Sequence, residues 1–170
     1  MVALAVEGTL AAYPCSVTCT LRLQRGIAVS IEDNKRVVAN FVQVCQNQHD
    51  LAAADEIFHP DFVNHYDPAG HPIPPTPSPA GGFQWFYGML LRAFPDATME
   101  INEQLAERDL VATRKTLRGT HLGEIWGLPP TGNRVEFEFI DIFRVKDGKL
   151  VEHWTHMDFD ALRLQMRPRE

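Results

Sequence analysis

The segment from Val135 to Asp158 predicts a long β-hairpin, and it constrains the fold more than any other part of the chain. In its first arm, VEFEFIDIF, apolar and charged side chains alternate as they do in a strand with one buried face. The tripeptide Lys146-Asp147-Gly148 is typical of the tight turn that joins two antiparallel strands. Such a hairpin must bury its apolar face against further elements, so the segment predicts a larger sheet.

The register of this hairpin depends on whether the turn has two or three residues. A two-residue Asp-Gly turn sets Asp141 opposite Trp154, whereas a three-residue turn with Gly148 as a left-handed bulge sets Asp141 opposite His153. We favour the three-residue turn because it gives one coherent face. The other pairs on that face are then Phe143 with Val151, Phe139 with Thr155 and Phe137 with Met157. An apolar wall that carries a carboxylate beside an imidazole is typical of a pocket with acid/base capacity.

This juxtaposition makes Asp141 and His153 our candidate catalytic pair. A carboxylate that accepts a hydrogen bond from one imidazole nitrogen fixes the tautomer and leaves the other nitrogen available as a general base. The alternative is a structural pair that only fixes the register of the sheet. His65, in the sequence Asn64-His65-Tyr66, is a third catalytic candidate, with a loop-capping role as its alternative. His121 ends a predicted strand and either lines the pocket or lies exposed.

The rest of the chain supplies the elements that this face needs. Three helices are predicted. The first begins after a Ser30 N-cap, the second covers Asp50–Phe58, and the third, over Gly82–Phe94, has the most regular apolar spacing. Strands are predicted over Thr98–Leu105 and Leu110–Thr120. Helices followed by antiparallel strands indicate an α+β fold with the helices packed on one face of a curved sheet. The proline-rich loop 67–80 is either a lid over the pocket or a disordered segment.

The chain of 170 residues has the length of one domain, and we assign residues 1–29 to an N-terminal extension and residues 30–170 to the domain itself. The formal net charge of -6 and the scattered basic residues argue against a nucleic-acid partner. No segment is apolar enough over sufficient length to cross a membrane. Three cysteines without a CxxC motif favour reduced thiols and a cytoplasmic protein.

Motifs for bound metals and cofactors are missing from the sequence. The histidines show no HExxH spacing, and no GxGxxG, P-loop or GxSxG motif occurs. We therefore predict no metal site and no cofactor. Trp154 follows His153 directly and therefore points to the other face of the hairpin, together with Ile140 and Ile142. An apolar patch on that face predicts either a covering helix or a homodimer interface.

Several segments together resemble one family. GTHLGEIWGLPPTG, DIFRVKDGKLVEHW, FVNH and AFPDATMEI are similar to the corresponding segments of the SnoaL-like polyketide cyclases, or ester cyclases, of the nuclear transport factor 2-like superfamily. The resemblance extends over about residues 31–166. It implies a cone-shaped barrel, in which a strongly bent antiparallel sheet and about three N-terminal helices close an apolar pocket. It also implies a homodimer that closes a polyketide ring by aldol condensation without a cofactor.

The resemblance also assigns positions within the pocket. His153 in EHW matches the family histidine, and Asn64 and His65 match polar pocket positions. The residue after the tryptophan is an aspartate in the polyketide cyclases and Thr155 here, while Asp141 occupies a facing position across the hairpin that is typically histidine. This chain therefore carries its carboxylate on the other strand, which would change the substrate atom that it reaches.

Our leading hypothesis is a cofactor-independent acid/base enzyme acting on a small apolar carbonyl compound or polyketide-like substrate. Asp141, His153 and His65 would be catalytic. The alternatives are a ketosteroid-isomerase-like isomerase or dehydratase and a non-catalytic small-molecule-binding protein. Residues expected to orient the substrate or shape the cavity are Asn64, Trp85, Tyr87, Arg114, His121, Phe137, Phe139, Thr155 and Met157.

Overall fold

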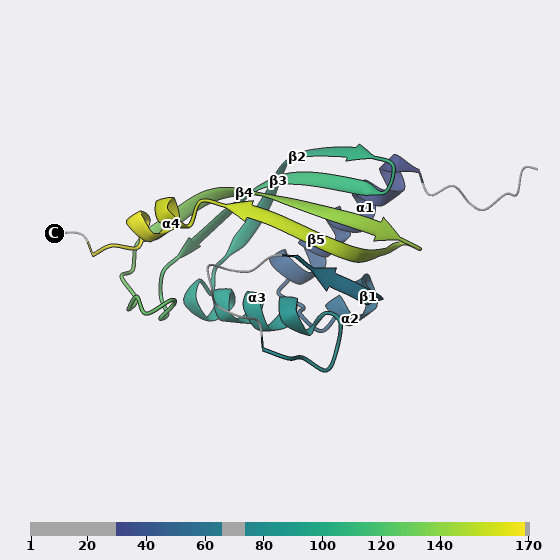
Figure 1. The fold of residues 1–170 in the computed structure, drawn as a ribbon. Coiled ribbons are helices and arrows are strands. Elements are labelled where there is room, and N and C mark those ends of the chain that lie inside the picture. Colours follow the sequence, from purple (N-terminus) through teal and green to yellow (C-terminus); the bar gives the residue numbers. More distant parts are fainter. Residues whose placement is uncertain (1–29, 66–73, 169–170) are drawn as a thin grey trace, which may run out of the picture.

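Four strands that follow one another in the sequence form a bent sheet, and a fifth strand joins its edge (Figure 1). The computed structural model describes residues 30–65 and 74–168. The elements in chain order are α1 (Ile31–Phe41), the π-helix η1 (Val42–Asn47), α2 (Ala54–Ile57), β1 (Phe58–Asn64), α3 (Gly81–Ala93), β2 (Thr98–Glu107), β3 (Leu110–Thr120), β4 (Arg134–Lys146), β5 (Lys149–Met157) and α4 (Phe159–Gln165).

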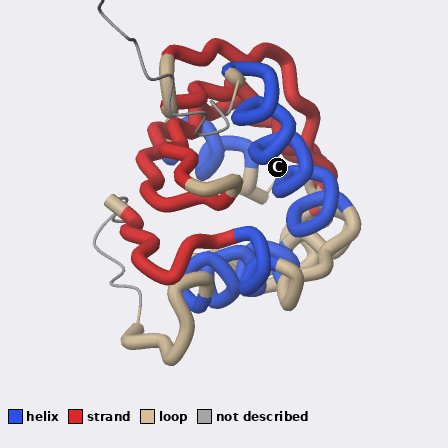
Figure 2. Tube along the Cα trace, turned by 90° about the vertical axis from the view of Figure 1, so that its right-hand side faces the viewer, coloured by secondary structure: helices blue, strands red, loops and turns tan. Residues whose placement is uncertain are grey.

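The strand order is β1-β5-β4-β3-β2, and the prediction of an α+β fold with a strongly bent sheet is confirmed. Neighbouring strands from β2 to β5 are antiparallel, whereas β1 runs parallel to β5, so the sheet is mixed rather than purely antiparallel. The edge position of β1 suits Pro60, which has no N–H to offer a further strand. Figure 2 shows the sheet curving, with helices next to the strands.

The helices follow their sequence signals with one exception. Ser30 caps α1 in a reciprocal capping box with Asp33, as its position before the apolar pattern predicted. The predicted helix over Asp50–Phe58 is wrong for most of its length, because only Ala54–Ile57 is helical and Phe58 already belongs to β1. Figure 1 shows α2 and α3 next to β1, on one side of strands β2–β5, with α4 at the far end of the sheet.

The turn of the β4–β5 hairpin has two residues, so the favoured three-residue turn is wrong. Asp147 and Gly148 have φ values of 52° and 75°, as in a type I′ turn, and Lys146 pairs with Lys149. The bulge lies further along β5, where Val151 is inserted between two ladder pairs.

The inserted residue moves the register by one more position. Asp141 consequently lies opposite Thr155, and Phe143 lies opposite His153. The predicted pairing of Asp141 with His153 is therefore displaced by two residues. A displacement of two keeps every side chain on its face, so both groups still point to the inner side.

Replacement of Gly148 by valine should destabilise the protein by about 1–2 kcal/mol, because a β-branched side chain strains a positive φ. Urea-induced unfolding followed by circular dichroism would measure the change. Asp147→Asn is the matched control, since asparagine is also favoured in this turn. Equal stability of both variants and the wild type would show that the turn does not have the conformation described.

Candidate active site

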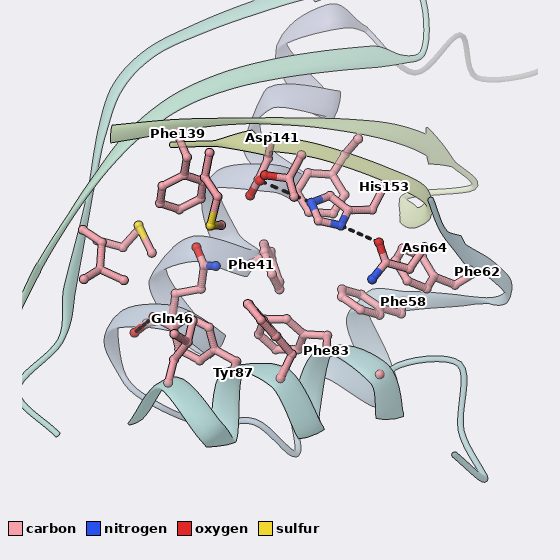
Figure 3. Close-up of a pocket in the computed structure, with 18 of the residues that line it drawn as sticks. Phe41, Gln46, Phe58, Phe62, Asn64, Phe83, Tyr87, Phe139, Asp141 and His153 are labelled. Carbon is pink, nitrogen blue, oxygen red and sulfur yellow. Dashed lines mark hydrogen bonds and ion pairs between the residues drawn. The ribbon is translucent and has the colours of Figure 1, made fainter. Parts of the chain in front are cut away.

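An apolar cavity lies between the inner face of the sheet, the helices and β1 (Figure 3). It measures about 60 Å³. Of the side chains around it, Phe62, Phe83 and Phe86 are only half-buried and so form the wall nearest to solvent. The aromatic lining residues are Phe41, Phe58, Phe62, Phe83, Phe86, Tyr87, Phe137, Phe139 and Phe143. The cavity therefore favours a flat apolar ligand, and a large one enters only if these outer rings move apart.

Three polar side chains form a chain along one wall of this cavity (Figure 3). Nε2 of His153 lies 3.3 Å from Oδ1 of Asp141, and Nδ1 of His153 lies 3.0 Å from Oδ1 of Asn64. The parallel pairing of β1 with β5 sets Asn64 beside His153 in register. The imidazole stacks on the ring of Phe143, with 4.5 Å between ring centroids. Strand pairing and aromatic packing together fix the orientation of the imidazole.

A fourth group, which the sequence reasoning missed, meets the other oxygen of the carboxylate. Nζ of Lys115, a fully buried residue of β3, lies 2.6 Å from Oδ2 of Asp141 and donates to Oε1 of Gln46 over 2.9 Å. The sequence carries a signal for this position, because Lys115 is separated from Val111 and Leu117 by even numbers of positions and so shares the buried face of the strand with them.

The charge state of Asp141 follows from these contacts. Burial by itself raises the pKa of this carboxyl group, but the neighbouring charges of Lys115 and His153 outweigh burial and lower its pKa below the ordinary value. Asp141 is only 4% exposed. It is therefore an ionised carboxylate that is kept from water by its partners.

The helices contribute a second polar group on the opposite side of the cavity. The π-helix η1 turns Gln46 toward the interior next to Phe41, and its backbone carbonyl accepts a hydrogen bond of 3.0 Å from the hydroxyl of Tyr87. Burial, then the charges of Asp141 and Cys45, raise the pKa of Tyr87. The phenol therefore stays protonated and serves as a donor.

The structure places six of the predicted pocket residues in the cavity wall, besides Asp141 and His153: Asn64, Tyr87, Phe137, Phe139, Thr155 and Met157. Thr155 lies opposite Asp141, and its hydroxyl donates to the carbonyl of Ile140 over 3.2 Å. Thr155 is thus a neutral neighbour of the carboxylate.

His65 lies outside the cavity, so its predicted position in the pocket is wrong. It bonds to Glu152 through Nε2 at 3.0 Å and stacks on Trp154, with centroids 4.6 Å apart. Adjacent residues of an extended segment point to opposite faces, and Asn64 takes the inner one.

Three more predicted pocket residues do not line the cavity. Arg114 points to the outer face, where it pairs with Glu103 and Glu138. Trp85 is half-buried on α3 but is not part of the cavity wall. His121 is fully buried elsewhere, where burial lowers its pKa and Nδ1 lies 3.1 Å from the hydroxyl of Thr131.

The outer face of the sheet carries the predicted apolar patch. Ile140 and Ile142 are 46% and 37% exposed, and Ile142 pairs with Trp154. Salt bridges of Arg114, Arg118 and Arg144 with acidic residues occupy the same face.

Within residues 30–65 and 74–168, no cluster of three or more His, Cys, Asp or Glu side chains could hold a metal ion. None of the helices described for this chain has the length and apolar character needed to cross a bilayer. The predicted N-terminal extension and part of the proline-rich loop, residues 66–73, lie outside the described residues.

Cys45, beside Gln46 on η1, should resist alkylation in the folded protein. It is fully buried, and burial, followed by the charge of Asp50, raises the pKa of its thiol to about 11. At pH 8 we expect iodoacetamide to leave the Cys45 peptide unmodified in native protein and to modify it after denaturation in urea, as read by mass spectrometry. Equal labelling in both conditions would contradict this burial.

Comparison with known proteins agrees with the fold. The profile of the SnoaL-like polyketide cyclases matches residues 36–166. Nogalonic acid methyl ester cyclase of Streptomyces nogalater is 30% identical over 115 residues, which is 66% of this chain and 81% of that protein.

Two crystal structures are similar at comparable identity. IdmH of Streptomyces antibioticus, a proposed polyketide cyclase, is 35% identical with a TM-score of 0.66, covering 78% of this chain and 97% of that chain. AclR of Streptomyces galilaeus, a proposed hydroxylase, is 32% identical with a TM-score of 0.68, covering 81% of this chain and 82% of that chain. The chain belongs to the SnoaL-like polyketide cyclase family of the nuclear transport factor 2-like superfamily.

Proposed function

We propose that this protein closes a ring in a polyketide-like substrate by cofactor-independent acid/base catalysis, with His153 as the base and Asp141 as the group that orients it. The observation that carries the proposal is the chain of contacts Asn64–His153–Asp141 in the wall of an apolar cavity. The family supplies the class of reaction, and the contacts support the roles proposed for these residues.

The proposed step begins with a neutral imidazole whose Nε2–H points to Asp141. Nδ1 lies 3.0 Å from Oδ1 of Asn64, so the side chain of Asn64 turns aside when the substrate binds. Nδ1 then takes a proton from a carbon activated by a neighbouring carbonyl, and an enolate forms. The enolate carbon attacks a second carbonyl of the same molecule, so a C–C bond forms and the C=O π bond becomes an alkoxide. The imidazolium then returns its proton to the alkoxide, and the enzyme regains its initial state.

The site suits the imidazolium that this step generates. Once both ring nitrogens carry protons, one faces the carboxylate of Asp141 and the other faces Oδ1 of Asn64. Both protons therefore have acceptors already in place, which lowers the energy of the charged intermediate. Asp141 itself is the weaker base, because the charges that lower its pKa disfavour its protonation.

Incubation of the protein with nogalonic acid methyl ester tests the proposal, since a relative is named for that compound. We expect a cyclised product of unchanged mass, formed faster than in buffer and resolved by liquid chromatography with mass spectrometry. Tight binding without turnover would support the small-molecule-binding alternative. A product heavier by one oxygen would instead support a hydroxylation like that assigned to AclR.

We also propose that two copies associate through the outer face of the sheet. Ile140 and Ile142 are exposed there, beside Trp154, and a monomer rarely leaves such a cluster open to water. Light scattering during size-exclusion chromatography should give twice the mass of 19.2 kDa. A monomer at micromolar concentration would contradict the association.

A further inference from the structure

Lys115 is a buried titratable group for which the proposed reaction has no role. The residue has no exposed surface, and Phe41 and Phe139 flank its ammonium group, whose Nζ lies 5.9 Å and 4.9 Å from their ring centroids. Burying an ammonium group among aromatic rings is strongly unfavourable unless the charge is paired. A fold that keeps such a charge beside the candidate base invites a functional explanation.

The contacts of Lys115 lead directly to the base. Its Nζ lies 2.6 Å from Oδ2 of Asp141, and the other oxygen of that carboxylate lies 3.3 Å from Nε2 of His153. Gln46 accepts a further hydrogen bond from Nζ and so fixes the position of the ammonium group. One carboxylate is therefore shared between two cationic or potentially cationic groups.

We propose that Lys115 is a positioning residue for His153: by sharing the charge of Asp141, it keeps the carboxylate ionised while allowing the imidazole to remain neutral and basic. This inference rests on the proposed function, in which His153 is the base. An unshared buried carboxylate would bind the imidazolium as its only counterion and hold its proton too tightly for a base. Without Lys115, the carboxylate of Asp141 and a protonated His153 would form an ion pair whose charges cancel, and the imidazole would not be free to act as a base.

The other titratable groups that face this cluster do not supply the missing charge. Tyr87, on α3, stays a neutral phenol because burial, then Asp141 and Cys45, raise its pKa. Cys45, on η1, stays a neutral thiol because burial raises its pKa to about 11. Asn64, from β1, does not titrate. Among the described side chains, the ion pair with Lys115 is thus the contact of Asp141 that can share the charge of the carboxylate with His153.

The test compares Lys115→Met with Arg114→Met. Both remove one positive charge from neighbouring positions of β3, but Arg114 points to the outer face and pairs there with Glu103 and Glu138. The imidazole resonances of His153 are followed by NMR as the pH is raised. We expect the titration of His153 to move to higher pH by about one unit or more in Lys115→Met and to stay unchanged in Arg114→Met.

The pH dependence of kcat/KM gives a second measurement. A purely structural role of Lys115 would leave this pH dependence unchanged. With nogalonic acid methyl ester as substrate, the acid limb of kcat/KM should move to higher pH by the same amount in Lys115→Met, which lowers turnover about tenfold on that limb and restores it at higher pH. An unchanged His153 titration in Lys115→Met would overturn the proposal.

A measurement on the wild type covers the case in which Lys115→Met does not fold. The side-chain carboxyl ¹³C signal of Asp141 should show an ionised group from pH 4 to pH 9, because Lys115 and His153 lower the pKa of this carboxyl group. Joint titration of the two groups in the neutral range would overturn the role of Lys115. If the wild type does not turn over the ester, the proposed function fails, whereas the NMR comparison still decides whether Lys115 controls His153.

Discussion

Replacing Asp141 by asparagine is expected to destabilise the protein by about 3–5 kcal/mol, although the two side chains have nearly the same shape. The substitution removes the carboxylate that lies 2.6 Å from Nζ of Lys115 and leaves a fully buried ammonium group without its counterion. Urea unfolding monitored by fluorescence would measure the change in the free energy of unfolding.

Two controls separate this effect from ordinary surface electrostatics. Glu138→Gln removes a carboxylate from the same strand, where it pairs with Arg114 on the exposed face, and should cost about 1 kcal/mol or less. The double variant Lys115→Met with Asp141→Leu removes the buried pair as a whole and should recover most of the stability. A loss below 1 kcal/mol for Asp141→Asn would contradict the buried ion pair.

The same ion pair predicts the effect of acid. Because the pKa of Asp141 is lowered in the folded protein, its contribution to stability is complete above the unfolded value of about 3.9 and is lost as the pH falls toward the folded value. Wild-type stability should therefore decline below about pH 4. Asp141→Asn, which has no such carboxyl group, should show a smaller decline over the same range.

The second large effect is expected on catalysis. His153→Gln should lower kcat by about 10²–10⁴, because glutamine keeps a polar group beside Asp141 and Asn64 but has no basic nitrogen. Ligand affinity should change little, since the wall of the cavity is mainly aromatic. Turnover and equilibrium binding by fluorescence quenching would be measured on the same preparation.

His65→Gln is the matched control for that substitution. His65 stacks on Trp154 at the outer face and does not line the cavity, so its replacement should leave kcat within about threefold of the wild type. If His65→Gln lost as much activity as His153→Gln, the assignment of the base would be wrong.

The sequence predicted the inner face of the hairpin because side-chain alternation survives an error in register. Asp141 and His153 needed only the right parity, and the displacement by two residues preserved it. The bulge at Val151 could not be predicted, since nothing in an apolar strand residue marks it as the inserted one. The same alternation places His65 on the face that Asn64 does not occupy, and it places Lys115 on the buried face of β3.

Other parts of the site depend on tertiary context that local patterns do not contain. Gln46 reaches the cavity because the first helix continues as a π-helix, which rotates the residues after Phe41. The parallel pairing of β1 with β5 brings Asn64 to His153, although the two residues are 89 positions apart in the sequence. Strand patterns predict that such a strand exists but not which edge it joins.

A crystal structure of the protein with nogalonic acid methyl ester or its cyclised product would show directly whether His153 lies at the reacting carbon. We expect the ligand to lie in the aromatic cavity, after outward movement of the rings of Phe62, Phe83 or Phe86. Its enolisable carbon should lie about 3–3.5 Å from Nδ1 of His153. A ligand bound on the outer face, or one whose reacting carbon contacts neither His153 nor its neighbours, would contradict this expectation.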